Sequence, residues 1–355
     1  MKKIVASILA FSLRNRFTIF MLTIALSAFG VYSAFHTPIE AFPDVTNSRV
    51  QIITQWPGRS AEEVEKFVTI PIEIEMNSIP KKESLRSVSL LGLSVVTILF
   101  EDGVDEFIGR QWVANKLPNL DLPDNISPEM QPSTGPTGEI YRYTLESNTK
   151  DVRELKTIQD WVIDRHLKSV PGVADIVSFG GDVKTYEISL DPRALSLYNI
   201  SALDVFEAVS TSNVNVGGDV IESNGQALVV RGIGLVNDIP EIENIIVTIA
   251  GKTPVLVKNL GFVHVSSLPN LGVVGKNKKD NVVEGMVLML KHENPSEVLT
   301  ALKEKIQELN DFILPPDVKI ETFYDRSELI NFTSHTVLRN LLEGITFVIL
   351  IVLVF

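Results

Sequence analysis

The sequence predicts a membrane protein of the α+β class, in which two transmembrane helices enclose a large extracytoplasmic region built from β-α-β split units. Apolar residues make up 45% of the 355-residue chain, although it also carries 44 acidic and 32 basic side chains. The longest apolar runs lie at the two ends of the chain. Between them, short β-branched runs alternate with capped amphipathic segments, which is typical of mixed domains.

The first apolar run, Phe17–Phe35, contains no charged residue and approaches the roughly 20 residues that cross a bilayer as a helix. The charged residues before the run are all basic, whereas the acidic residues Glu40 and Asp44 follow it. The positive-inside rule then puts residues 1–16 in the cytoplasm, with transmembrane helix 1 at 17–36. A cleaved signal peptide is the alternative interpretation.

The second apolar run occupies residues 337–355, with Arg339 and Glu343 in its first turns. A chain that has left the cytoplasm once must return through a second span. We therefore assign the start of transmembrane helix 2 to this run. Because the run is still apolar at Phe355, we expect the chain to be the N-terminal part of a larger membrane protein.

The first α/β unit is expected at residues 37–130. Its predicted elements are a strand at Val50–Gly58, a helix after Ser60, two strands on either side of Gly92 and a helix at Val104–Leu117. Ser60 and Glu63 have the spacing of a capping box. Pro71 is expected to bend or break the first helix, because it lacks an N–H group.

The second α/β unit is expected at 131–212 and 278–333, interrupted by a β-rich insertion at 213–277. Its predicted elements are a strand at Glu139–Ser147, a helix capped by Asp151, a strand pair turning at Gly180–Gly181, helices within 192–212, a strand at Val282–Pro295 and a helix capped by Ser296. The insertion contains a predicted hairpin with an Asn224–Gly225 turn. Because the two predicted strand pairs can be overlaid, we interpret the units as a weak internal duplication of ferredoxin-like, β-α-β split units.

Charge and motif content exclude several classes of function. The net charge of −12 argues against nucleic-acid binding, which needs clustered basic residues. The chain has no cysteine, so it can form neither disulfides nor thiolate metal sites. Its five histidines form no metal-binding pair, and no nucleotide-binding or hydrolase motif is present. We therefore expect no enzyme.

Seven segments, in order along nearly the whole chain, resemble the N-terminal part of resistance-nodulation-division (RND) efflux pumps of the heavy-metal, CzcA/CusA branch. They are TPIEAFPDVT (Thr37–Thr46), PGRSAEEVEKFVTIPIE (Pro57–Glu73), SLLGLSVVTILFEDGVD (Ser89–Asp105), STGPTGEIYRY (Ser133–Tyr143), LDPRALSLYNIS (Leu190–Ser201), GGDVIESNGQALVVRGIG (Gly217–Gly234) and TFYDRSELI (Thr322–Ile330). The FPDV, FEDG and YDRS motifs favour this branch over the drug-exporting branch.

The resemblance implies domain names, partners and energetics. The two α/β units would be porter subdomains and the insertion a docking domain. The protein would be a homotrimer in the bacterial inner membrane, with a large periplasmic region, an adaptor protein and an outer-membrane channel as partners. It would be a secondary active transporter with no cofactor, in which a metal cation is the substrate and the proton the coupling ion. The proton-relay residues would lie beyond this chain.

The resemblance also singles out two carboxylates as candidate metal ligands. Glu139 opens the first strand of the second unit and Asp175 lies in the PGVADI segment, so both could meet in one sheet. Two carboxylates suit hard or borderline divalent ions better than Cu(I), which prefers thioether sulfur. The alternative is that each is an ordinary exposed carboxylate at a strand end.

Two other functions remain open on the sequence. One is an RND exporter of amphiphilic organic compounds, which would call for an aromatic pocket, whereas aromatic residues are only 7% and scattered. The other is a two-span, membrane-anchored sensor or binding module. Additional membrane helices and a second porter repeat further along the reading frame would favour an exporter over such a module.

Overall fold

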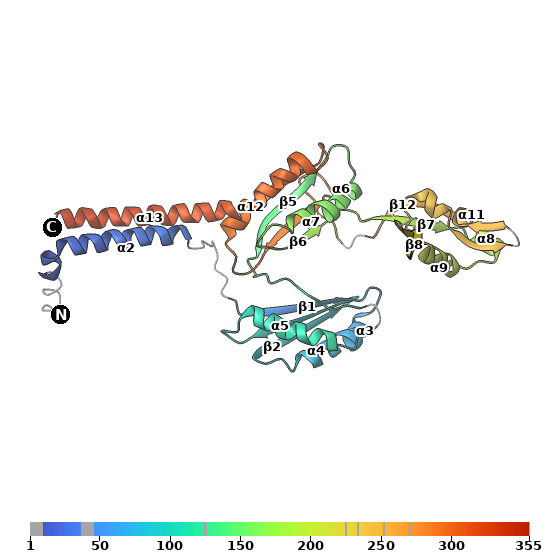
Figure 1. Ribbon diagram of the computed structural model, residues 1–355, viewed down its shortest axis with the longest axis horizontal. Coiled ribbons are helices and arrows are strands. Elements are labelled where there is room, and N and C mark those ends of the chain that lie inside the picture. The colour runs from blue at the N-terminus through green and yellow to red at the C-terminus, as the bar shows by residue number, and fades with distance from the viewer. Residues whose placement is uncertain are drawn as a thin grey trace.

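The computed structural model describes residues 10–36, 46–123, 126–223, 226–232, 234–250, 253–269 and 272–354. Helices α2 (Arg16–His36) and α13 (Arg326–Val354) extend toward one end of the molecule (Figure 1). Three α/β bodies lie beyond them, which we call the first unit, the second unit and the outer lobe. The outer lobe is inserted into the second unit and lies farthest from the two helices.

The first unit is a four-stranded antiparallel sheet with helices on one face (Figure 1). Its strands, in the order β2-β3-β1-β4, are β1 (Arg49–Gln55), β2 (Lys82–Leu90), β3 (Leu93–Phe100) and β4 (Glu129–Met130). Its helices are α3 (Ala61–Val64), α4 (Ile70–Met76), α5 (Glu106–Lys116) and a 3-10 turn (Leu117–Asn119). Alternate residues of β3 are buried, which fits a sheet with one covered face.

The first helix of this unit begins as predicted but does not break at Pro71. Ser60 accepts a hydrogen bond from the Glu63 N–H, and the Glu63 carboxylate accepts one from the Ser60 N–H. A π turn at Glu65–Thr69 follows α3, and α4 continues through Pro71 to Met76. The π turn directly before Pro71, in which the Ile70 N–H donates to the Glu65 carbonyl, widens the helix where the proline N–H is missing.

The second unit is also a four-stranded antiparallel sheet, in the order β14-β5-β13-β6. Its strands are β5 (Glu139–Glu146), β6 (Val173–Phe179), β13 (Glu284–Met289) and β14 (Lys319–Asp325). Its helices are α6 (Val152–Ile158) and α7 (Asp164–Leu167), joined by a π turn (Gln159–Ile163), and α12 (Pro295–Glu308), followed by a π turn (Leu309–Ile313). The core between helices and sheet includes Tyr143, Ile163, Leu167 and Leu302.

One of the two predicted caps in this unit is correct. Asp151 caps α6 and forms a capping box with Glu154. Asn294, not Ser296, caps α12: its side chain accepts a hydrogen bond from the Ser296 N–H at 3.1 Å. The cap moves forward because Pro295, with its fixed φ and no N–H, is suited to the first helical position.

Within the described residues of the outer lobe there are three two-stranded sheets and four short helices. The strand pairs are β7 (Lys184–Leu190) with β12 (Gly261–Ser267), β8 (Val216–Ser223) with β9 (Gln226–Gly232), and β10 (Ile246–Ala250) with β11 (Thr253–Leu256). The helices are α8 (Pro192–Tyr198), α9 (Ala202–Ser212), α10 (Ile239–Glu243) and α11 (Val257–Leu260). The predicted hairpin pairs as expected, with Ser223 opposite Gln226, while its Asn224–Gly225 turn lies outside the described residues.

The predicted strand pair at Gly180–Gly181 is wrong. Strand β6 pairs with β13 in the second unit, whereas β7 pairs with β12 in the outer lobe. The overlay of strand pairs on which the internal duplication depended therefore has no counterpart here. The boundary expected at residue 212 also differs, because 184–212 belong to the outer lobe with 213–267.

Two left-handed glycines explain why the chain leaves the sheet at this point. Gly180 and Gly181 have φ of +66° and +75°. A Cβ on Gly180 would lie 2.2 Å from the Val282 carbonyl oxygen, and the Gly181 N–H donates to Asn281 Oδ1 at 3.1 Å. The outgoing strand thus crosses close against the returning one, an approach that side chains would prevent. We call residues 272–283 the return segment.

The apolar helices differ from their predicted extents. Helix α13 is continuous from Arg326 rather than starting near Val337. Among the described residues it is the one helix that is long and apolar enough to cross a membrane, whereas the apolar part of α2 is shorter, Arg16–Gly30. Arg326 is buried and donates a hydrogen bond to the Thr137 carbonyl, which anchors the start of α13 to the second unit.

Candidate functional site

The sheet of the second unit has one face packed on helices and one face turned away from them. Tyr143 lies on the helix side, where its hydroxyl donates to Gln159 at 3.1 Å. Neighbouring positions on a strand alternate between faces. Arg142 and Thr144 of β5, with their partners Met286 and Glu284 of β13, therefore share the other side. We call this side the open face.

The helix side fixes the strands that carry the open face. Gly285 is opposite Tyr143, and a Cβ at Gly285 would lie 2.2 Å from the ring carbon Cζ of Tyr143. The Tyr143 ring is fully buried and fills the space that a larger residue would need. Burial also raises the pKa of Tyr143 far above its ordinary value, so this hydroxyl stays protonated.

Glu139 lies at the start of β5, where a bulge shifts the register against β13. Its carboxylate binds the Arg142 guanidinium through two hydrogen bonds, from Nε at 2.5 Å and from Nη2 at 2.8 Å. Arg142 also donates from Nη1 to Glu284 at 3.1 Å. The hydrogen bond to Glu139, together with the charge of Glu284, raises the pKa of Arg142. Arg142 therefore holds two carboxylates at once.

Asp175 lies in β6 and is held in a similar way. Lys168, just after α7, approaches Asp175 Oδ1 at 2.7 Å and Asp164 Oδ2 at 3.2 Å. Burial lowers the pKa of Lys168, but the two carboxylates outweigh it and the net shift is upward. Burial raises the pKa of Asp164. Lys168 is thus a cation shared by two acidic groups.

The two predicted residues share one sheet but not adjacent strands. Glu139 and Asp175 both pair with Leu288, from opposite sides. With one strand between them, their Cα atoms are about 10 Å apart, twice the spacing of neighbouring strands. Directly paired residues face the same side of a sheet. The register therefore brings Glu139, Leu288 and Asp175 into one row across the open face.

No third acidic or histidine side chain completes a metal site within the described residues. Glu139 and Asp175 offer oxygen donors to a divalent cation only if Arg142 and Lys168 move aside. Their side chains are 33% and 29% exposed, so both can be reached from solvent. The row can supply part of an ion site, with further ligands from another source.

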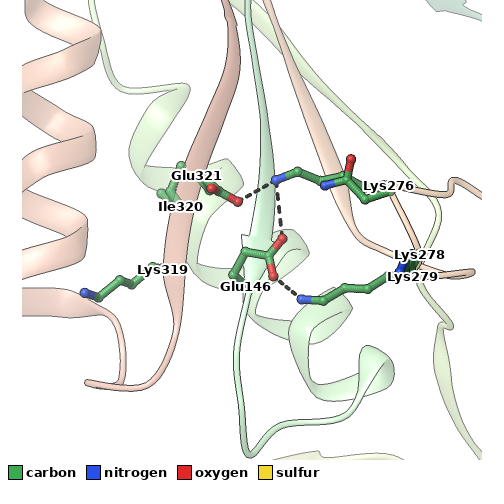
Figure 2. Close-up of a pocket in the computed structure, with 8 residues that line it drawn as sticks. Glu146, Lys276, Lys278, Lys279, Lys319, Ile320 and Glu321 are labelled. Atoms are coloured by element: carbon green, nitrogen blue, oxygen red, sulfur yellow. Dashed lines mark hydrogen bonds and ion pairs between the residues drawn. The ribbon is translucent and has the colours of Figure 1, made fainter.

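The other end of the open face carries carboxylates that sequence reasoning missed. Glu146 of β5 and Glu321 of β14 face the return segment, from which Lys276 reaches both, at 3.3 Å and 2.5 Å (Figure 2). Lys279 makes a further ion pair with Glu146. Lys276 also donates to Thr144 at 2.8 Å. These residues line an open cavity of about 730 Å³. The KNKK run marks the lysines in the sequence, but not their partners Glu146 and Glu321, which are 130 and 45 residues from Lys276.

The chain belongs to the AcrB/AcrD/AcrF family of RND transporters, whose sequence profile matches residues 8–355. It is 37% identical to the protein HelA of Legionella pneumophila, over 98% of this chain and 34% of HelA. It is 36% identical to the cobalt-zinc-cadmium resistance protein CzcA of Cupriavidus metallidurans, over 98% of this chain and 34% of CzcA. The chain therefore spans about a third of the length of these relatives.

Solved structures agree with the heavy-metal branch. A crystal structure described as a heavy metal efflux pump superimposes with a TM-score of 0.86 at 40% identity, covering 93% of this chain and 33% of the pump. A second crystal form gives 0.83 at 38% identity. These matches confirm the predicted resemblance and the mixed α/β fold of an RND protein.

Proposed function

We propose that the chain is part of a bacterial inner-membrane exporter of heavy-metal cations. The observation that carries this proposal is similarity along 93–98% of the chain to a heavy metal efflux pump and to a cobalt-zinc-cadmium resistance protein. The open face adds chemistry that suits the proposal, because its carboxylates match hard and borderline divalent ions. The metal ion is a substrate in this account, and the protein needs no cofactor.

In this proposal the two α/β units are porter subdomains and the outer lobe is a docking domain. Helices α2 and α13 cross the inner membrane, and the three bodies lie in the periplasm. The transporter works as a homotrimer with an adaptor protein and an outer-membrane channel, driven by proton influx. The distance of the outer lobe from the two helices supports a docking role, because it leaves the lobe free to meet a partner (Figure 1).

Within the proposed exporter, Glu139 and Asp175 bind the metal ion on its path. Their shared row across the open face supports this role. The two strands belong to one rigid sheet, so the relative positions of the carboxylates are set by β13 between them. Other parts of the transporter would supply the remaining ligands.

Metal export in cells tests the proposed function. The complete transporter, expressed with its adaptor and outer-membrane channel in a metal-sensitive bacterium, is challenged with zinc, cobalt, nickel, cadmium, copper and silver. We expect protection against at least one divalent ion. Failure to lower cell content of any of the six metals would contradict the proposal.

Two variants then test the site. Glu139→Gln combined with Asp175→Asn removes both charges with little change in shape. We expect a loss of export of about tenfold or more, because even the loss of groups that support a metal ligand costs about 10–100-fold. Glu304→Gln on α12 is the matched control, because this exposed carboxylate lies outside the face. Full export by the double variant would show that the ion takes another route.

A further inference from the structure

Both candidate ligands on the open face are already paired with a cation from the chain itself. Arg142 binds Glu139 bidentately and reaches Glu284, while Lys168 bridges Asp175 and Asp164. In each group two carboxylates share one basic side chain, so each group keeps a formal charge of −1 when all its members are ionised. This remaining negative charge attracts a cation to both groups.

We propose that Arg142 and Lys168 are displaceable counter-ions that set the affinity of the site and drive ion release. This inference rests on the proposed function. In the empty site, Arg142 and Lys168 hold the carboxylates in place and prevent them from pairing with other basic groups. An arriving ion displaces them, and their return competes with the ion and promotes its departure.

Exposure makes this exchange feasible. The side chains of Arg142 and Lys168 are 35% and 44% exposed. Ion pairs at such positions are weak because water screens them and because long side chains lose rotamer freedom on pairing. A divalent ion carries twice the charge and loses no such freedom. It can therefore displace Lys168 from Asp175 and Arg142 from Glu139, while Arg142 keeps its contact with Glu284, whose side chain is only 9% exposed.

A buried ion pair elsewhere in the chain shows what these exposed pairs are not. Lys291, just after β13, lies 3.8 Å from Glu106 of α5 in the first unit, with side chains only 8% and 11% exposed. Separating such a pair would leave buried charges without solvent. The Glu139–Arg142 and Asp175–Lys168 pairs differ, because all four side chains are 29–44% exposed and water can take over each head group. Exposure therefore separates exchangeable pairs from permanent ones.

The geometry also predicts whether the loss of Arg142 or the loss of Lys168 increases metal affinity more. Arg142 holds Glu139 through two hydrogen bonds, whereas Lys168 makes a single contact to Asp175. Bidentate guanidinium–carboxylate pairs are stronger than single contacts to an ammonium. Removing Arg142 should therefore free its carboxylate more than removing Lys168 does.

Zinc binding to the complete transporter in detergent tests the proposal, with Zn²⁺ alone as the probe. We expect Arg142→Gln to lower the Kd for zinc by about tenfold, equivalent to one charge–charge contact of about 1.4 kcal/mol. Lys168→Gln should lower it by a smaller factor. Arg153→Gln is the matched control, because Arg153 makes a similar two-bond pair with Asp151, is 36% exposed, and lies on α6 away from the face. The control should leave the Kd unchanged.

Transport kinetics give a second readout that a merely structural role would not move. In Arg142→Gln, the KM for zinc export should fall together with the maximal rate, because a tighter site fills sooner and empties more slowly. A weaker or unchanged Kd in both Arg142→Gln and Lys168→Gln would overturn the inference while wild-type export still upholds the proposed function. If the wild-type protein binds and exports no metal, the proposed function fails and the inference with it.

Discussion

The two ends of the open face use the same chemistry in different ways. At one end, Glu139 and Asp175 are held by basic residues three and seven positions away in the sequence. At the other end, Glu146 and Glu321 are held by Lys276, 130 and 45 residues away, on the return segment. The Glu139–Arg142 and Asp175–Lys168 pairs can open without moving the backbone. The pairs of Lys276, like the pair of Arg142 with Glu284 on β13, instead join segments that are far apart in the sequence.

The largest effect should come from disturbing the sheet that supports both ends. Gly285→Ala would push a methyl group into the Tyr143 ring. Overpacking of this kind costs about 1–3 kcal/mol and sometimes more. We expect the midpoint of thermal unfolding, followed by circular dichroism, to fall by several degrees. Gly217→Ala is the control, since its Cβ would meet no atom within 4 Å and should leave the midpoint unchanged. Equal midpoints for the two variants would refute the role assigned to Gly285.

A smaller and local effect should follow from removing the ion pairs between Lys276 of the return segment and the sheet. Lys276→Met removes the ion pairs to Glu146 and Glu321 and the hydrogen bond to Thr144. We expect opening of the return segment to become easier by about 1–2 kcal/mol, since hydrogen bonds to charged groups contribute on this scale. Hydrogen exchange at residues 272–283 reports this opening.

The same segment offers a matched control for Lys276. Lys278 is exposed and two residues away, so Lys278→Met should leave exchange at residues 272–283 unchanged. Arg142→Gln should also leave it unchanged, because its pairs lie at the other end of the face. If Arg142→Gln loosened the return segment as much as Lys276→Met, the two ends would not be independent.

The smallest effect should be the pH dependence of the ion pairs that hold the return segment on the sheet. The hydrogen bond from Lys279, aided by Lys276, lowers the pKa of Glu146 below 4.5. A carboxylate with a lowered pKa stabilises the fold above its unfolded pKa, and this contribution is lost as pH falls through its folded pKa. Burial lowers the pKa of Lys276, but Glu321 and Glu146 outweigh it and raise the value above 10.5. This lysine contributes fully below its unfolded pKa and loses its contribution as pH rises through the folded pKa.

The lowered pKa of Glu146 and the raised pKa of Lys276 together set the pH range in which these ion pairs protect the return segment from exchange. Protection of the return segment, corrected for the intrinsic exchange rate, should stay constant between about pH 5 and 9, fall below pH 4.5 and fall again above pH 10.5. Lys279→Met should remove most of this acid dependence, because the hydrogen bond from Lys279 is the main cause of the lowered pKa of Glu146. A midpoint near neutral pH would point to a different titrating group.

Local structure could be predicted well from the sequence, whereas the pairing of strands that are distant in the sequence could not. The capping boxes at Ser60 and Asp151 and the strand pair around Gly92 follow from neighbouring residues, and all three are correct. Gly180 and Gly181 also have the φ values that a tight hairpin requires. Their strands nevertheless enter different sheets, because the choice of partner depends on Val282 and Asn281, a hundred residues further on.

The candidate site was predicted in part. The resemblance to heavy-metal pumps pointed to Glu139 and Asp175, and the structure puts both on either side of Leu288. Their role as ligands remains a proposal. Arg142 and Lys168 had no signal in the sequence, because an arginine or lysine near a carboxylate is common in any chain. Only the bulge in β5 and the turn after α7 bring them to these carboxylates.

The most direct test of the account is the position of a bound metal. Crystals of the complete transporter, grown with zinc and measured at the zinc absorption edge, report metal positions by anomalous scattering. We predict an anomalous peak within about 2.0–2.2 Å of the Glu139 or Asp175 carboxylate oxygens, the usual Zn–O distance, with the Arg142 and Lys168 head groups moved away. Zinc elsewhere in the transporter, with the Glu139–Arg142 and Asp175–Lys168 pairs intact, would contradict the account.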